Sequence, residues 1–288
     1  MNFLLAAFMG LFQGLTEFLP VSSSGHLNLL HALFGLDIEH QLLFNILLHV
    51  GTLIPVIIVF WKDWVDMLLH PIKNKTLLLL FIASLPALAA KVLFGDQLDY
   101  FETHNTILGV CFLFTGLLLF LSQKWSIRRE QSDKQTKQVG FFHALCMGCM
   151  QAVGILPGIS RSGSTIFGGI ASGLTREKAA KFSFMMSAPA IVAGFLSEGY
   201  SAFKAGAFSV SGDWAAIVIG VIVAGVSGYF SIRFMLRLIA KASLNWFALY
   251  VTVLGILVII LQITGVMADA PSAAEAVPAA AKAFGALL

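Results

Sequence analysis

The sequence predicts an all-α integral membrane protein, an inverted-repeat bundle of six transmembrane helices and two re-entrant helix-loop-helix hairpins. Three observations lead to this fold class: a very apolar composition, two apolar regions broken in the middle, and a repeat that relates the two halves. Of the 288 residues, 58% are apolar and 11% are charged, and the mean hydropathy is +0.87. Soluble domains carry roughly 25% charged residues, so a soluble protein with a large core is the less favoured alternative.

Six apolar runs are long enough to cross the roughly 30 Å hydrocarbon layer of a membrane as helices. They lie near residues 42–60, 77–94, 106–122, 182–197, 214–232 and 246–264.

Two further apolar regions, about 3–36 and 141–173, are interrupted by proline, glycine and serine. Neither Pro20 with Ser22 to Gly25 nor Pro157 with Gly158 to Gly163 can lie in continuous helix. Irregular backbone at membrane depth must be surrounded by protein or line a water-filled cavity, so each region is predicted to be a re-entrant hairpin. Two separate short transmembrane helices per region are the alternative.

Charges in the loops predict the orientation. The segments 61–76, 123–139, 174–181 and 233–241 hold most of the lysines and arginines, whereas the alternate loops hold the acidic residues Asp37, Glu39, Asp96, Asp99, Glu102, Glu198 and Asp213. The positive-inside rule places the basic segments in the cytoplasm and both chain ends outside. This assignment is consistent only if both broken regions return to the side from which they entered.

The two halves of the chain also repeat. A shift of 138 residues superposes Gln13 on Gln151, Ser22 on Ser160, Ser24 on Ser162 and Gly25 on Gly163. Because the first half begins outside and the second inside, the repeats are inverted, and such repeats place a binding site where their broken helices meet. We therefore expect one membrane domain, 1–266, made of repeats at about 1–122 and 139–264. The Ala/Pro-rich tail, 267–288, is expected to be a disordered or surface-lying extension.

The breaks carry a concentration of polar groups that is costly in hydrocarbon unless the groups are paired. Gln13 and Glu17 are four residues apart and share one helix face. The hydroxyls of the two breaks precede apolar stretches and are therefore N-cap candidates; they belong to Ser22, Ser23, Ser24, Ser160, Ser162 and Ser164. Two helix N-termini facing a common centre, with the guanidinium of Arg161 beside them, predict an anion site suited to phosphate.

Several of these residues have two readings. Glu17 suits a ligand of a hard divalent cation or a base, but it could also form a purely structural ion pair with Arg161. His26 could transfer a proton or contact phosphate, or it could be a helix-start residue bonded to backbone. One serine could be a nucleophile, although capping accounts for at least one of them. Asn45 and His49, another i, i+4 polar pair, could pack together or join the site.

The run Gln13-x-x-x-Glu17, with Phe18-Leu-Pro-Val-Ser-Ser-Ser-Gly-His26 and Pro157-Gly-Ile-Ser-Arg-Ser-Gly-Ser-Thr165, resembles the signature motifs of the undecaprenyl-diphosphatase family, the bacitracin-resistance proteins of bacterial membranes. The resemblance covers essentially the whole chain to about residue 265. It implies hydrolysis of undecaprenyl diphosphate to undecaprenyl phosphate and inorganic phosphate at a site that opens to the extracytoplasmic side of the cytoplasmic membrane. It also implies a divalent cation, Mg²⁺ or Ca²⁺.

Carried over by motif, the resemblance implies Glu17, Ser23, His26 and Arg161 as the central residues. The surrounding substrate-binding residues are expected to be Gln13, Ser22, Ser24, Ser160, Ser162 and Thr165. Position 13 of the family motif can be Glu or Gln; here it is Gln, which leaves Glu17 as the expected metal ligand. The expected partners are the polyprenyl diphosphate and the membrane, with no nucleic acid, and a homo-oligomer is compatible with the sequence.

Two mechanisms and one rival function stay open at this point. Ser23 could attack phosphorus after activation by Glu17 or His26, or these residues could position a water. The rival is a secondary transporter or lipid flippase, because inverted repeats with broken helices are typical of transporters. The crowded reactive side chains favour chemistry, and a structural or interaction protein would leave them unexplained.

Overall fold

The structure is a computed structural model that describes residues 2–34, 41–132, 135–204, 214–265 and 267. The expectations for the loop residues 37–39, for Lys134, for Asp213 and for most of the tail lie outside these residues. The described chain forms eleven α-helices and one short 3-10 helix. In chain order they are α1 (Phe3–Phe18), α2 (Ser23–Phe34), α3 (Gln41–Val59), α4 (Trp61–Leu69), α5 (Thr76–Thr103), η1 (Asn105–Ile107), α6 (Leu108–Gln131), α7 (Phe141–Val153), α8 (Arg161–Ser172), α9 (Arg176–Lys204), α10 (Trp214–Lys241) and α11 (Asn245–Ile263).

Five of these helices are long and apolar enough to cross a membrane. They include residues 76–98, 105–131, 176–197, 214–241 and 245–263, and a sixth candidate is α3 taken together with α4. The axes of α3 and α4 are bent by 75° at Phe60. The described residues therefore match the six predicted apolar spans when this bent pair is counted as one.

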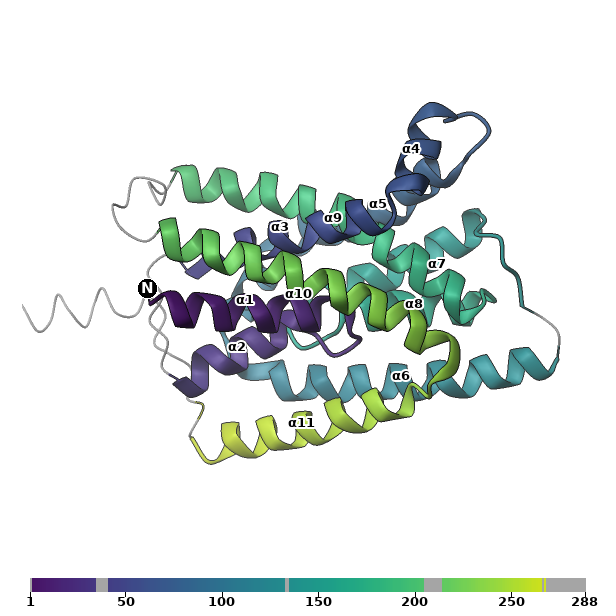
Figure 1. The fold of residues 1–288 in the computed structure, drawn as a ribbon. Helices are drawn as coiled ribbons and strands as arrows, with labels where there is room; N and C mark the ends of the chain where they lie inside the picture. Colours follow the sequence, from purple (N-terminus) through teal and green to yellow (C-terminus); the bar gives the residue numbers. More distant parts are fainter. Residues whose placement is uncertain (1, 35–40, 133–134, 205–213, 266, 268–288) are drawn as a thin grey trace, which may run out of the picture.

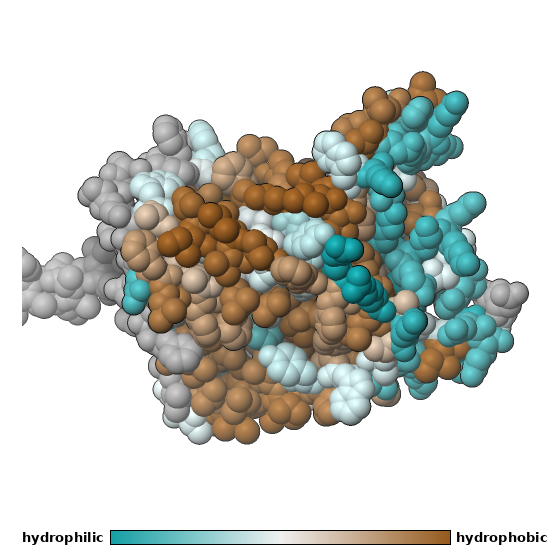
Figure 2. All heavy atoms as spheres, in the orientation of Figure 1, coloured by the Kyte–Doolittle hydropathy of each residue, from teal (hydrophilic) through white to brown (hydrophobic). Residues whose placement is uncertain are grey.

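The surface agrees with a protein that lies in hydrocarbon. Figure 2 shows hydrophobic residues over the middle of the molecule and hydrophilic residues gathered at the end where α4 projects. Leu78, Phe81, Leu85 and Leu88 of α5 all expose their side chains. An exposed apolar band of this breadth marks a surface that faces lipid or a partner rather than water.

Two short hairpins form the centre of the fold. The first hairpin consists of α1, residues 19–22 and α2; the second consists of α7, residues 154–160 and α8. In Figure 1, α1 runs from the end of the bundle that holds the N-terminus toward the middle, and α2 runs back, whereas α7 and α8 lie nearer the other end. The predicted breaks at Pro20 and Pro157 thus fall at the tips of the two hairpins.

Each hairpin packs on a long helix of the other half of the chain: α1 lies along α10, and α7 lies along α5. The first contact is close because glycines face it. A Cβ atom added at Gly14 would lie 2.0 Å from the Ser227 hydroxyl and 2.4 Å from the Ala224 carbonyl oxygen. Small residues allow such close backbone approach in membrane bundles, so neither half is a self-contained unit.

The helix bounds carry the same offset as the sequence repeat. The second hairpin's α8 begins 138 residues after α2, at Arg161 against Ser23. The pair α5 and α10 shows the same offset where the helices end, from Thr103 to Lys241.

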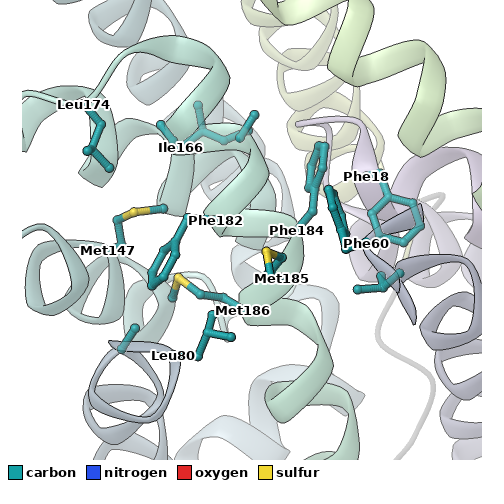
Figure 3. Packing of buried hydrophobic residues seen from close by; sticks show 14 of the residues in the cluster. Phe18, Phe60, Leu80, Met147, Ile166, Leu174, Phe182, Phe184, Met185 and Met186 are labelled. Carbon is teal, nitrogen blue, oxygen red and sulfur yellow. The ribbon is translucent and has the colours of Figure 1, made fainter. Parts of the chain in front are cut away.

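An apolar core fixes the two hairpins against the long helices. The rings of Phe18 and Phe184 meet edge to face, with centroids 5.6 Å apart. Figure 3 shows these rings beside Met185 and Phe60, with Met147 and Ile166 of the second hairpin in the same cluster. Phe18 follows Glu17 directly, so this packing holds the end of α1 in place beneath the site.

Candidate active site

Glu17 lies in the last turn of α1, and its carboxylate is the centre of the site. The side chain is 3% exposed. Its Oε2 atom accepts hydrogen bonds from Gln13 Nε2 (2.9 Å) and Ser23 Oγ (2.6 Å), and its Oε1 atom accepts one from Arg161 Nη2. A buried charge is costly unless it is paired and hydrogen-bonded. Both conditions are met here.

The turn between α1 and α2 brings Ser23 back to Glu17. The helix α1 ends at Phe18, just before Pro20, because proline disfavours helical backbone at the preceding residue. Ser22 then adopts a positive φ of 70°, which reverses the chain so that α2 starts at Ser23. The Ser22 hydroxyl accepts a hydrogen bond from Gly25 N (3.3 Å), and its expected role as an N-cap is confirmed.

The tip of the second hairpin presents Arg161 at the start of α8. Ser160 is the N-cap, and its hydroxyl accepts a hydrogen bond from Gly163 N at 3.1 Å. Thr115 of α6 braces the turn, because its hydroxyl donates to Gly158 O and accepts from Ser160 N, both at 3.0 Å. Gly158 has a φ of 89°, a conformation that costs glycine little. The backbone of this turn therefore fixes the position of Arg161 at the first residue of α8.

The two tips touch each other. A Cβ atom added at Gly25 would lie 2.9 Å from the Gly158 Cα atom, and the Ser162 hydroxyl donates to Leu19 O at 3.1 Å. This contact brings Arg161 to Glu17. Of the predicted central residues, the structure thus brings Glu17, Ser23 and Arg161 together, with Gln13 beside them.

His26 lies next to this group but has different partners. Its Nδ1 atom is 2.7 Å from Ser22 O, and its Nε2 atom is 2.7 Å from the hydroxyl of Tyr250 on α11. Ser23, in contrast, donates its hydroxyl proton to Glu17. The geometry therefore makes Glu17, and not His26, the acceptor of the Ser23 proton.

The remaining predicted residues surround the tips. Thr165 bonds within the protein, to Arg161 O at 2.8 Å and to the hydroxyl of Ser183 at 2.6 Å. Ser160 and Ser162 have hydroxyls 3.2 Å apart. Ser24 is partly exposed in the first turn of α2. These residues line the N-terminal ends of α2 and α8, where free N–H groups favour an anion.

His49 of α3 also contacts the carboxylate. Its Nδ1 atom is 2.8 Å from Asn45 O, and its Nε2 atom lies 3.7 Å from Glu17 Oε2. Of the two readings left open by the sequence, the structure gives His49 a position in the site. Its polar character within an apolar span was the signal.

Sequence reasoning missed Thr115, Ser183 and Tyr250. Each is a hydroxyl-bearing residue within an apolar helix, and such groups need a partner in hydrocarbon. Hydroxyl-bearing residues within apolar helices could therefore have been recognised from the sequence, but the sequence does not reveal which partner each of them has.

A family model described as bacitracin resistance protein BacA matches residues 6–257. The chain belongs to the BacA family. The matched range includes every residue of the site described above and both hairpins, apart from the first three residues of α1.

Curated relatives support the BacA assignment over nearly the whole chain. A protein from Carboxydothermus hydrogenoformans, named undecaprenyl-diphosphatase, is 40% identical over 265 residues, which cover 92% of this chain and 99% of the relative. One from Halothermothrix orenii with the same name is 39% identical over 256 residues, covering 88% and 96%. A third, from Methanosphaera stadtmanae, is 34% identical over 285 residues, covering 91% and 99%.

The donor atoms in this BacA-family site can be tested against the cation that the resemblance implies. Among the described residues there is no group of three His, Cys, Asp or Glu side chains that could hold a metal ion. Mg²⁺ is usually bound by one or two carboxylates together with substrate phosphates and water, and it needs no such cage. Glu17 supplies one carboxylate, and the buried Gln13 Oε1 atom has no hydrogen-bond partner among the described residues. These oxygens fit a hard cation that is shared with a phosphate.

Proposed function

We propose that this protein dephosphorylates undecaprenyl diphosphate, giving undecaprenyl phosphate and inorganic phosphate and thereby supporting bacitracin resistance. Membership of the BacA family and relatives named undecaprenyl-diphosphatase support this function. The observation that carries it at the site is the contact of Arg161 with Glu17 and of Glu17 with Ser23, where the two hairpin tips meet. A cation, a base and a hydroxyl are thus assembled beside two helix N-termini.

In the proposed reaction the diphosphate binds at the N-terminal ends of α2 and α8. Arg161 offers a planar fork to phosphate oxygens, and the surrounding hydroxyls of Ser160 and Ser162 hold the group in place. The prenyl chain of the bound substrate extends sideways from the site into the lipid. Fixed donors aimed at the phosphoryl oxygens stabilise the charge that develops during transfer.

Ser23 is the proposed nucleophile and Glu17 its base. As the bond from Ser23 Oγ to the terminal phosphorus forms, the hydroxyl proton passes to Glu17, and the phosphorus–bridging-oxygen bond breaks to release undecaprenyl phosphate. Water then attacks the phosphoserine: its hydroxyl completes inorganic phosphate, its other proton goes to solvent, and Glu17 returns the first proton to Ser23 Oγ. The 2.6 Å bond between Ser23 and Glu17 supports this pairing.

A divalent cation, Mg²⁺ or Ca²⁺, would be held by Glu17 and Gln13 Oε1 together with the substrate. Bound there, it would supply Lewis-acid stabilisation of the phosphoryl charge. His26 and Thr165 complete the set of residues that we assign to the site.

We further propose that the chain is one domain of two inverted repeats, about 1–122 and 139–264, with the two hairpins re-entering a bacterial cytoplasmic membrane. The shared 138-residue offset of α2 with α8 and of α5 with α10 supports the repeat. The lysines and arginines of the segments 61–76, 123–139, 174–181 and 233–241 support a cytoplasmic face at the end near α4, where Figure 2 shows hydrophilic residues gathered. In this orientation the first hairpin enters from the extracytoplasmic side, to which the site opens.

Phosphate release from undecaprenyl diphosphate by the purified protein in detergent tests the function. With no membrane gradient present, a phosphatase turns over, whereas a transporter or flippase releases nothing. If the wild-type protein releases no more phosphate than an Arg161→Ala variant, the proposed phosphatase function is rejected.

A further inference from the structure

Tyr250 reaches the site from α11, outside both hairpins. Its hydroxyl lies 2.7 Å from His26 Nε2, whereas His26 Nδ1 lies 2.7 Å from Ser22 O. The imidazole is buried, the two rings are nearly parallel at 14°, and Phe112 meets the imidazole edge-on with centroids 5.5 Å apart. The ring of His26 is therefore fixed on three sides.

The hydrogen-bond chemistry decides which nitrogen of His26 carries the proton. A carbonyl oxygen only accepts hydrogen bonds, so Nδ1 must be the N–H that donates to Ser22 O. A neutral imidazole has a single N–H, which leaves a lone pair on Nε2. The Tyr250 hydroxyl is then the donor to that lone pair.

We propose that Tyr250 is a positioning residue that acts through His26. It holds the imidazole as the Nδ1–H tautomer and directs the Nε2 lone pair toward α11 and away from Ser23. The proposal rests on the proposed phosphatase function and assigns Tyr250 a part in it. It also accounts for the division of work in the site: the Ser23 proton goes to Glu17, while His26, with both ring nitrogens hydrogen-bonded, fixes the turn at Ser22 that places Ser23.

A double-mutant cycle tests whether Tyr250 acts through His26. Tyr250→Phe removes one oxygen atom and keeps the ring, and we expect kcat on undecaprenyl diphosphate to fall about tenfold with KM within about twofold. In a His26→Ala background the same change should alter kcat by less than about twofold. Tyr229→Phe is the matched control, because the Tyr229 hydroxyl bonds Arg233 on the same helix, outside the site, and it should behave as wild type.

Equal losses in both backgrounds, or a Tyr250→Phe enzyme that matches the Tyr229→Phe control, would overturn the proposal. If the wild-type protein releases no phosphate, the proposed function fails, and the positioning role is then decided by spectroscopy, which needs no turnover. In ¹⁵N-histidine spectra, the His26 signals are identified by their loss in His26→Gln.

Wild-type protein should show a protonated Nδ1 and an unprotonated Nε2 at His26. Tyr250→Phe should shift the Nε2 signal or produce a mixture of tautomers, and Tyr229→Phe should do neither. An Nε2–H tautomer in the wild type, or a spectrum unchanged by Tyr250→Phe, would contradict the proposal. Tm values in detergent report whether each variant is folded.

Discussion

Arg161 and Glu17, 144 residues apart in the chain, form an ion pair at the point where the tips of the two hairpins touch. The Glu17 side chain is almost completely buried, whereas the Arg161 side chain is 24% exposed, and only its Nη2 atom bonds the Glu17 carboxylate. Arg161 therefore has donors left for a second anion after it has paired with Glu17. A residue that binds phosphate needs such donors, whereas a purely structural counter-ion does not.

Replacing Arg161 with Lys keeps the charge but removes the planar fork. We expect kcat/KM to fall at least about tenfold, equivalent to roughly 1.4 kcal/mol of transition-state stabilisation. Phosphate release by the purified variant measures it, and Arg233→Lys, outside the site, is the control. Near-normal turnover of the Arg161→Lys enzyme would mean that the ion pair is only structural.

Ser23→Ala removes the proposed nucleophile and should abolish turnover. Ser22→Ala, one residue earlier, should instead reduce stability by roughly 1 kcal/mol, because Ser22 caps α2. Kinetics and thermal unfolding of the two variants separate these roles. A folded Ser23→Ala protein that keeps more than about a tenth of the wild-type kcat would exclude a covalent step and leave water as the attacker.

Chelation should remove the activity. With EDTA we expect phosphate release to fall at least about tenfold and to recover when Mg²⁺ or Ca²⁺ is added, since the cation offsets charge on the phosphoryl group. Gln13→Glu places a second carboxylate beside Glu17 and should lower the Mg²⁺ concentration needed for half-maximal recovery. Activity that EDTA leaves unchanged would show that Arg161 and the helix ends suffice.

The orientation can be tested with single cysteines in a background that lacks Cys111, Cys146 and Cys149. Gln97 on α5 and Gln131 on α6 are both exposed. An impermeant thiol reagent applied to intact cells, with any outer membrane permeabilised, should label a cysteine at position 97 and spare one at 131. The reverse pattern would overturn both the orientation and the re-entrant hairpins.

Gly14→Ala tests the packing of α1 on α10. The added methyl group would meet Ser227 and Ala224 at distances no carbon tolerates, so we expect a loss of stability of about 1–3 kcal/mol. Gly194→Ala on α9 is the control, because a Cβ atom there meets nothing within 4 Å. Alanine's higher helix propensity should make that variant neutral or slightly more stable. Equal Tm values for the two variants would contradict this packing.

The sequence was sufficient to predict the parts of this fold that depend on single residues. Pro20 and Pro157 predict the two breaks because proline cannot continue a helix. The contact of Glu17 with Arg161 could be foreseen as a possible pair, since each is the single formally charged residue of its broken region and charges in hydrocarbon need partners.

Other features depend on which helices pack together, and local patterns carry no such information. His26 and Tyr250 are 224 residues apart, so their contact exists only in the assembled bundle. The bend of 75° after α3 was also missed, because Phe60 is neither proline nor glycine and Pro55 lies five residues before it, inside α3. His49 was recognised as polar, but its distance to Glu17 required the packing of α3 against α1.

The packing of each hairpin on a helix of the other half has a consequence for biosynthesis. Glu17 is translated long before Arg161, and α10, the helix along which α1 lies, is made later still. Until then the nascent chain carries a carboxylate without its cation in an apolar environment, a state that membranes disfavour. A chain that stops at its midpoint therefore lacks Arg161, the counter-ion of Glu17. It also lacks α10, on which α1 packs, and the N-terminal end of α8. The cluster of Glu17, Ser23 and Arg161 can therefore assemble only after the second half of the chain has been inserted.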